Sequence, residues 1–329
     1  MYKTEFCDRA RWREVVGWIH HDLGEESQRT QVALDTLQQG SADGVVGVVR
    51  ESFSGHMVAG CYAANLAGGV VSIGAIRIDR HDVLEQLTQL LKGAVGQYRS
   101  QGIELVQAIA TEFTALERQV LAGIGLRFLA YLDHLVLFVA DEKLAAGGAV
   151  DALHASAALH ASDAQQASAA VHNRAQGLRL VEYCEGDYED LVEVVTASYI
   201  DTLDCPLLGD LRTGKAAVEG YMAARDQRHS WWLAELAGQR VGCLLLWERA
   251  PEVWELTYMG IIPAVRGRQF GKVLLEAAIA LTVRLGAKQL VLSVDRENEP
   301  AVRLYHQRGF YCYNSTEVWF GDRMVGAGD

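Results

Sequence analysis

The chain has 329 residues, of which half are hydrophobic and 22% are charged, and its formal net charge is −12. This length suggests two domains, and the composition is typical of a globular protein with a substantial core. The acidic balance excludes general binding to nucleic acid or to an anionic membrane, because phosphate surfaces are met by faces rich in Lys and Arg.

The cysteines and histidines indicate neither a disulfide framework nor a metal site. The six cysteines are scattered and form no CxxC pair, as expected for reduced thiols in a cytoplasmic protein. The ten histidines are equally dispersed, so we expect no metal. No apolar run is long enough to span a membrane, and the polar first residues are not those of a secretory signal.

Residues 1–143 are predicted to form a first domain because they share a pattern with the last part of the chain. A shift of 184 positions places Gly286 on Gly102 and Gly309 on Gly125 without a gap. The same shift aligns two further pairs of segments, 256–263 with 72–79 and 301–310 with 117–126. Such an ungapped register is what a tandem duplication leaves behind.

Residues 144–176 are dominated by Ala, Ser, His and Gln and hold few large apolar side chains. We interpret them as an interdomain linker. Alanine favours helix, so the linker is predicted to be partly helical, after a break at Gly147 and Gly148.

Residues 177–329 are predicted to form a second domain, an α/β fold with a mixed sheet and helices on both faces. Asp187 is a plausible N-cap of its first helix, and of Trp231 and Trp232 one should be in the core and the other outward. The expected elements are a strand at 177–183, helices at 187–203 and 213–226, strands at 230–236, 240–249 and 253–263, a helix at 271–286, a strand at 288–295, a helix at 299–309 and a strand at 311–320.

The segment VRGRQFGKVLL, residues 265–275, places Arg266, Arg268 and Lys272 together in an acidic chain, at the start of a predicted helix. A helix N-terminus offers backbone N–H groups and the positive end of the helix dipole. Glycines let a bulky anion approach the main chain, so the segment predicts a phosphate cradle. It fits neither the P-loop nor the GxGxxG pattern.

Two motifs in this half resemble those of the GNAT superfamily of acetyl-CoA-dependent N-acetyltransferases. The first, (Arg/Gln)-x-x-Gly-x-(Gly/Ala), corresponds to residues 266–271. The second, Asn-x-x-Ala-x-x-x-Tyr-x-x-x-Gly-Phe, corresponds to Asn298, Ala301, Tyr305, Gly309 and Phe310. The resemblance covers roughly residues 177–321. It implies an N-acetyltransferase and, with the repeat, two tandem GNAT-like domains.

The resemblance also implies which residues bind acetyl-CoA. Amides from Val265 to Lys272 would hold the pyrophosphate, with Arg266 and Arg268 adding charge, and the backbone of the strand before them would pair with the pantetheine arm. The implied cofactor-binding residues are Met259, Ile261, Arg266, Gly267, Arg268, Gln269, Gly271, Lys272 and Asn298.

For catalysis, the resemblance implies that Tyr305 protonates the leaving thiolate as general acid; the alternative is a core tyrosine. Glu255 would take the proton from the amine, directly or through water; the alternative is a structural ion pair. Gln269 departs from the glycine common in the family. We expect it to lie in the first helical turn with negative φ; a positive φ would put coenzyme A binding in doubt.

The first repeat lacks these residues. At the shifted register Arg266 falls on Asp82, Gly271 on Leu87 and Tyr305 on Leu121. We expect a degenerate repeat that keeps the fold and has lost the chemistry. Such a repeat would pack on the active half, shape its acceptor cleft or mediate a homodimer.

The loop 198–213 is expected on the acceptor side. It holds several carboxylates, which would suit a cationic amine or would simply cap turns. Cys205 has no base at a recognisable spacing, so we do not expect a nucleophile there. The acidic residues of the loop are Asp201, Asp204 and Asp210, beside Tyr199.

The leading hypothesis is acetyl transfer to a primary amine by direct attack on the thioester. The alternatives are another acyl-CoA donor, a non-catalytic acyl-CoA-binding or scaffolding protein, and a nucleotide-binding module. The amine stays open among small molecules and peptides.

Overall fold

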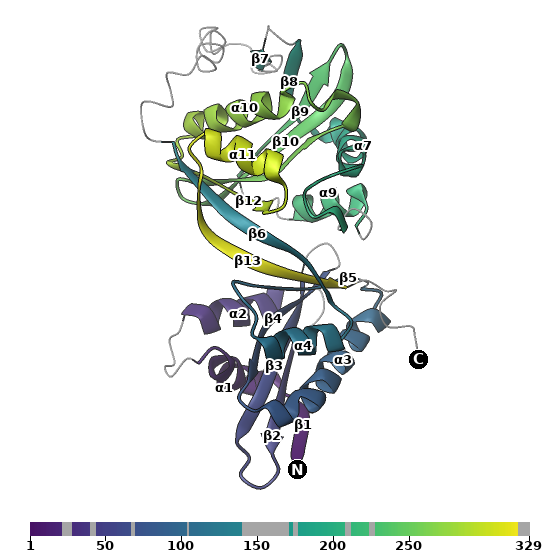
Figure 1. Cartoon of the computed structure of the whole chain (residues 1–329), viewed down its shortest axis with the longest axis vertical. Coiled ribbons are helices and arrows are strands. Elements are labelled where there is room, and N and C mark those ends of the chain that lie inside the picture. The colour runs from purple at the N-terminus through teal and green to yellow at the C-terminus, as the bar shows by residue number, and fades with distance from the viewer. Residues whose placement is uncertain are drawn as a thin grey trace. The chain divides into compact units, whose positions relative to one another are not determined.

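The structure, a computed structural model, describes residues 1–21, 28–39, 44–66, 70–103, 105–139, 171–173, 177–207, 212–223 and 228–321 (Figure 1). The predicted linker 144–176, with its break at Gly147 and Gly148, lies outside these residues except for the short strand β7 (Val171–Asn173). Among the described residues, no helix is long and apolar enough to cross a membrane.

The chain forms two compact units: unit 1 is Met1–Tyr131 with Thr316–Asp329, and unit 2 is Leu132–Ser315. Two strands, β6 (Arg127–Phe138) and β13 (Tyr311–Gly321), each contribute residues to both units. The last strand of the first repeat therefore completes the sheet of unit 2, and the last strand of the second repeat completes that of unit 1. The domain limits at 143 and 177 delimit the repeats along the chain and stay a prediction.

In unit 1 the sheet order is β1-β2-β3-β4-β5-β13, and β13 pairs with β5 through Glu317–Gly321. Helices α1 and α2 pack with one hydrophobic cluster, and α3 and α4 pack with another that includes residues of β4 and β5. The elements are β1 (Tyr2–Phe6), α1 (Arg9–Ile19), α2 (Gln28–Gln39), β2 (Val45–Glu51), β3 (Met57–Leu66), β4 (Val70–Ile78), α3 (Leu84–Ser100), β5 (Leu105–Ala110) and α4 (Ala115–Gly123).

In unit 2 the sheet order is β6-β12-β11-β10-β9-β8-β7, and only β11 and β12 are parallel neighbours. The predicted order of elements is confirmed. The helix predicted at 187–203 ends early, at Tyr199, and the helix predicted at 213–226 is described from Gly214 to Ala223. The remaining elements are β8 (Leu178–Glu182), α7 (Tyr188–Tyr199), α9 (Gly214–Ala223), β9 (His229–Leu236), β10 (Gln239–Ala250), β11 (Val253–Ile261), α10 (Phe270–Arg284), β12 (Gln289–Asp295) and α11 (Glu299–Gln307).

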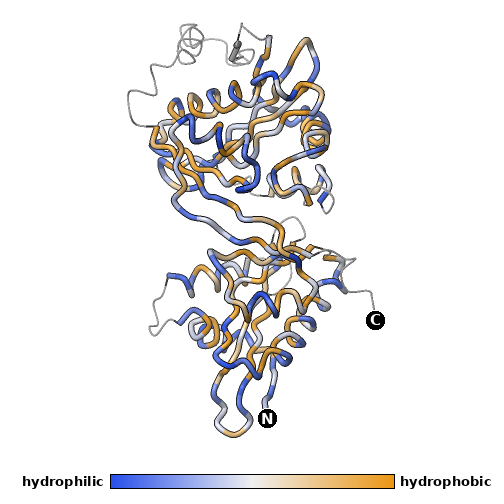
Figure 2. The backbone as a smooth tube through the Cα atoms, in the orientation of Figure 1, coloured by the Kyte–Doolittle hydropathy of each residue, from blue (hydrophilic) through white to orange (hydrophobic). Residues whose placement is uncertain are grey.

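Helices cover both faces of the unit 2 sheet, as predicted. The prediction that one of the two tryptophans of β9 points outward is therefore wrong. Trp231 packs with residues of α7 and α9, and Trp232 packs with residues of α10. The two side chains alternate between faces as expected, but neither points outward, since they are 5% and 1% exposed. Apolar residues accordingly gather in the strands and on the helix faces of both units (Figure 2).

The duplication is visible in the structure. Helices α4 and α11 begin at Ala115 and Glu299, 184 positions apart, and have the same length. The four aligned glycines follow helices and have left-handed φ values, +86° at Gly102 against +79° at Gly286, and +90° at Gly125 against +86° at Gly309. Glycine adopts this conformation without a Cβ penalty, which explains why it ends the helix in both repeats.

Asp187 occupies the N-cap position of α7 but does not cap it with its side chain. Its carboxylate instead accepts hydrogen bonds from the backbone N–H of Cys184, at 2.9 Å, and from the Cys184 thiol, at 3.0 Å. The short 3-10 turn before α7, Glu185–Asp187, draws the side chain back to this turn.

Candidate active site

The parallel strands β11 and β12 separate midway along β11. Their pairing ends at Leu256 and Leu292. At the same level Thr257 is an extra residue in β11, because the register with β10 shifts between its two neighbours. Such a bulge bends a strand and increases its twist. The second half of β11 is therefore paired with β10 on one side and unpaired with β12 on the other.

The open side of β11 presents the backbone that was predicted to pair with pantetheine. The N–H of Ile262 donates to Val241 of β10. Because successive residues of a strand turn their backbone groups to opposite sides, those of Met259 and Ile261 face away from β10. The Ile261 carbonyl already accepts a hydrogen bond from Arg266 at 3.1 Å. The groups left for a ligand are the Ile261 N–H and both backbone groups of Met259.

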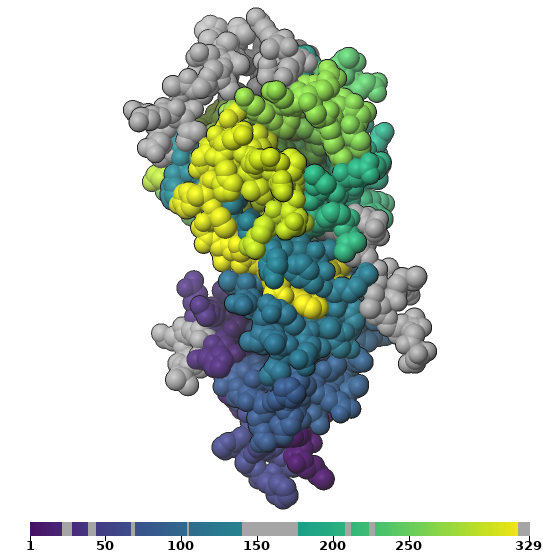
Figure 3. Space-filling model, viewed as in Figure 1, coloured from purple at the N-terminus to yellow at the C-terminus, as the bar shows by residue number. Residues whose placement is uncertain are grey.

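Two adjoining cavities lie at this opening. One, of about 360 Å³, is lined by β11, β12, α11 and the loop after α7, and includes Met259, Asn298 and Tyr305. The other, of about 650 Å³, is lined by the loop before α10 and by α11. Five residues border both cavities: Ile261, Arg266, Gly271, Pro300 and Leu304. Residues of α11 and β13 form the yellow surface of unit 2 in Figure 3.

The loop before α10 presents a shorter run of amides than predicted. The N–H groups of Val265 and Arg266 donate to Ile262 and Pro263, and that of Lys272 donates to Gln269. In the described part of the chain, the N–H groups of residues 267–271 have no such backbone acceptor. The candidate cradle is therefore the backbone from Gly267 to Gly271 at the positive end of α10.

Gln269 does not have the conformation that the sequence predicted. It precedes α10 as N-cap, with φ +61° and ψ +15°, in the left-handed region. The prediction of a negative φ in the first helical turn is wrong. The loop reverses direction within a few residues to enter the helix, and this requires a left-handed residue where many family members have glycine. Gln269 still lines the larger cavity.

Arg266 is held by carbonyl groups. Its guanidinium donates to the carbonyls of Ser198 at 2.8 Å, Ile200 at 2.8 Å and Asp201 at 3.0 Å, besides that of Ile261. The side chain ties the cradle loop to the C-terminal end of α7, where carbonyls lack helical partners.

The other two cations are placed differently. Lys272 is exposed and lines the larger cavity. The guanidinium of Arg268 stands over the Phe270 ring, 4.9 Å from its centroid, and Arg268 does not line either cavity. Lys272 is thus the cation best placed to meet a phosphate.

Tyr305 is buried and also lines the smaller cavity. Its packing in the core is therefore compatible with a place in the site. Its ring packs against Phe310 with centroids 5.6 Å apart. Burial, and then the charge of Asp204, raise the pKa of Tyr305 well above that of a free phenol. Asn298 caps α11 by accepting from the Ala301 N–H at 3.4 Å, and also hydrogen-bonds the side chain of Asp204.

Two aspartates that are far apart in sequence meet beside Tyr305. Asp204 accepts from the Asp295 N–H at 2.9 Å, and Asp295 accepts from the Cys205 N–H at 3.0 Å. Desolvation and the Asp295 charge raise the pKa of Asp204. The sequence marked Asp204 only as one of several loop carboxylates and missed Asp295. Burial also raises the pKa of the Cys205 thiol, and Asp210 lies outside the described residues.

Glu255 lies on the face of β11 opposite Trp254 and does not line either cavity. Its carboxylate accepts from the Trp247 indole N–H at 3.1 Å and from Arg249 at 3.0 Å. The ion pair that the sequence left as an alternative is therefore present.

On the β12 side a serine lines the cavity and a histidine contacts that serine, and neither residue belongs to a local sequence motif. Ser293 of β12 lines the smaller cavity, and its hydroxyl is 2.8 Å from Nδ1 of His134 on β6. Burial and the charge of Arg249 lower the pKa of His134, against an opposing effect of Glu255. The first repeat thus supplies an imidazole that contacts the wall of this cavity.

The diverging strands and the free amides before α10 form a groove that can take an extended ligand with an anionic end. Residues 196–310 match the sequence profile of the Acetyltransferase (GNAT) family. The C-terminal region of the chain is a GNAT acetyltransferase domain, and the chain is an acyltransferase enzyme with a tandem GNAT-like fold.

Similar proteins agree with this class. A mycothiol acetyltransferase of Amycolatopsis mediterranei is 26% identical over 320 residues, which are 90% of this chain and 96% of that protein. A mycothiol acetyltransferase of Corynebacterium aurimucosum is 35% identical over 72 residues, 22% of this chain and 24% of that protein.

Two solved structures share the fold of the whole chain. A GCN5-related N-acetyltransferase from Sphaerobacter thermophilus has a TM-score of 0.58 at 15% identity, covering 98% of this chain and 95% of its own. A tandem GNAT protein from the clavulanic acid biosynthesis pathway has a TM-score of 0.52 at 15% identity, covering 99% of this chain and 100% of its own.

Proposed function

We propose that unit 2 transfers an acetyl group from acetyl-CoA to a primary amine of a small molecule. The observation that carries the proposal is the continuity of the two cavities, which runs from the amides of residues 267–271 past Met259 to Tyr305. The relatives named as mycothiol acetyltransferases support a small-molecule acceptor.

The two ends of this groove suit the two ends of acetyl-CoA. At one end, amides of the loop before α10 and Lys272 meet the pyrophosphate, where charge-assisted hydrogen bonds to backbone N–H groups are strong. Along the middle, Met259 and the Ile261 N–H pair with the pantetheine amides as an added strand would. The thioester then lies beside Tyr305.

In the transfer step the amine nitrogen attacks the thioester carbon, the C–N bond forms and the C–S bond breaks. Tyr305 gives its proton to the departing thiolate, and the raised pKa keeps this phenol protonated until then. Glu255 receives the amine proton through water, because its carboxylate stands on β11 outside the cavity. No covalent acyl-enzyme is needed.

Tyr305→Phe tests the general acid. The variant keeps the ring packed on Phe310 and removes only the hydroxyl, so we expect turnover to fall about 10²-fold or more while the Kd for acetyl-CoA stays the same. Amine acetylation is followed by thiol release, and acetyl-CoA binding by calorimetry. An unchanged rate would refute the acid role.

Lys272→Glu tests the cradle independently of the acceptor. Lys272 is exposed in the first turn of α10, so charge reversal should leave folding intact and weaken acetyl-CoA binding about tenfold or more. Lys92→Glu, at an exposed position of α3 in unit 1, makes the same change in net charge and serves as control. Equal losses of acetyl-CoA affinity in the two variants would contradict a phosphate site at this loop.

The alternative hypotheses make different predictions. A non-catalytic acyl-CoA-binding protein would bind one acetyl-CoA per chain and turn over none of a panel of amines. A nucleotide-binding module would let ATP compete at the loop 266–272. Both measurements use the wild-type protein.

A further inference from the structure

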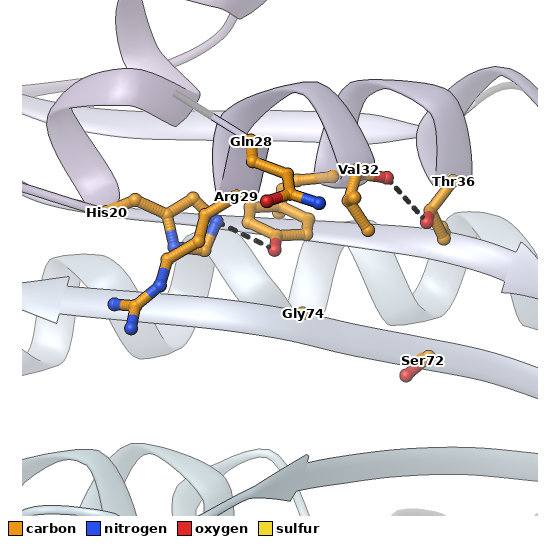
Figure 4. Close-up of a pocket in the computed structure, with 10 residues that line it drawn as sticks. His20, Gln28, Arg29, Val32, Thr36, Ser72 and Gly74 are labelled. Carbon is orange, nitrogen blue, oxygen red and sulfur yellow. Dashed lines mark hydrogen bonds between the residues drawn. The ribbon is translucent and has the colours of Figure 1, made fainter. Parts of the chain in front are cut away.

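Unit 1 contains a cavity of about 490 Å³ between α2, the end of α1 and the strands β3 and β4 (Figure 4). This volume lies within the range of small-molecule pockets. It is separate from the acetyl-CoA groove, all of whose lining residues belong to unit 2. The lining residues are His20, Gln28, Arg29, Val32, Ala33, Thr36, Tyr62, Ala64, Ser72 and Gly74.

The duplication shows how the two repeats differ at the floor of this cavity. The shift of 184 places Gly74 on Tyr258. In unit 2 the Tyr258 ring fills the space below α7 and α9, 6.0 Å from the Tyr199 ring and 5.8 Å from that of Tyr221. In unit 1 there is no side chain at this position, and the Tyr62 ring lies over the glycine in its place.

Gly74 also fixes the floor of the cavity. A Cβ at this position would come within 1.8 Å of the Tyr62 ring. The ring therefore lies directly over the glycine backbone, and its hydroxyl is held 3.0 Å from His20 Nε2 (Figure 4). Burial raises the pKa of Tyr62 to about 12, so the hydroxyl stays protonated.

The chemistry of the lining selects for an anion with an apolar body. Among the lining residues that the structure describes, Arg29 and His20 supply the titratable nitrogen groups, and none is Asp or Glu. In Figure 4 the Arg29 side chain extends from α2 toward β4, on the same side as His20. In the part of the chain that the structure describes, Arg29 has no carboxylate partner. Val32, Ala33 and Ala64 provide the apolar walls.

We propose that this cavity is a binding site in unit 1 for a small organic carboxylate, with Arg29 as its charge partner, the His20–Tyr62 pair as its polar contact and the walls of α2 and β3 against its apolar part. The degenerate repeat thus has a ligand of its own. The proposal does not depend on acetyl transfer by unit 2.

Benzoate is a suitable probe, and benzamide is its neutral counterpart of nearly equal shape. Ligand-observed NMR titration of the full chain should show benzoate bound several-fold more tightly than benzamide, because only the carboxylate pairs with a guanidinium. Arg29→Ala should weaken benzoate binding about tenfold and leave benzamide unchanged. Arg29 is exposed, so the variant should fold.

Arg127→Ala is the matched control, since Arg127 is another exposed arginine of unit 1, at the start of β6. It should bind benzoate as the wild type does. Lys272→Glu should also leave benzoate binding unchanged, which separates this cavity from the cationic loop of unit 2. The proposal is overturned if benzoate does not bind, if it binds no better than benzamide, or if Arg29→Ala and Arg127→Ala have equal effects.

Discussion

Replacement of Gln269 by glycine should stabilise unit 2. Gln269 has φ +61°, where the Cβ of an L-residue costs roughly 1–2 kcal/mol. Glycine avoids this penalty but loses more conformational entropy on folding, roughly 0.5–1 kcal/mol. The difference leaves a gain of about 1 kcal/mol. For a unit of this size that corresponds to an increase in Tm of about 2–4 °C.

Gln269→Ala is the control that isolates the backbone effect. It removes the same side chain beyond Cβ and keeps the left-handed penalty, so its Tm should stay close to that of the wild type. Scanning calorimetry of the three proteins, with urea unfolding as a second measure, gives the comparison. If the glycine and alanine variants have equal stability, the reasoning from backbone strain is wrong.

The same pair of variants reports on the cradle. The amide of residue 269 is present in every variant and already has the loop conformation, so acetyl-CoA affinity should differ by less than about threefold among them. A tenfold tighter glycine variant would mean that the Gln269 side chain obstructs the phosphate.

Three further predictions follow from unit 2. Arg266→Ala removes four hydrogen bonds to carbonyls at an exposed position and should cost about 2 kcal/mol in urea unfolding; the cradle role alone would leave stability unchanged. Trp232→Ala empties a core position and should cost about 3–5 kcal/mol by the same assay. Burial lowers the pKa of His134 in the folded chain, so the unfolded chain takes up this proton at a higher pH than the folded chain does. The free energy of unfolding should therefore fall as pH drops through about 6.5. His134→Gln should flatten that part of the pH–stability curve, and an identical slope would contradict the assignment.

Much of the fold could be predicted because its signals are local. The order of elements in unit 2 follows from apolar periodicity, and Gly286 and Gly309 end helices because they need a left-handed backbone. The motif residues Asn298 and Tyr305 lie on one short helix, so their spacing alone brings both to the same cavity. Gln269 shows the limit of this reasoning, since a loop's φ depends on how the following helix is docked.

The sequence by itself determined the duplication, the two α/β repeats and the loop that opens α10, since each depends on residues close together or on a fixed offset. Only the tertiary structure decided which strand completes which sheet, because an edge strand carries no mark of its partner. It also decided the contacts of Arg266 with Ser198 and of Ser293 with His134, which join residues 68 and 159 positions apart. Side-chain pairs at such separations have no local pattern, and packing alone brings them together.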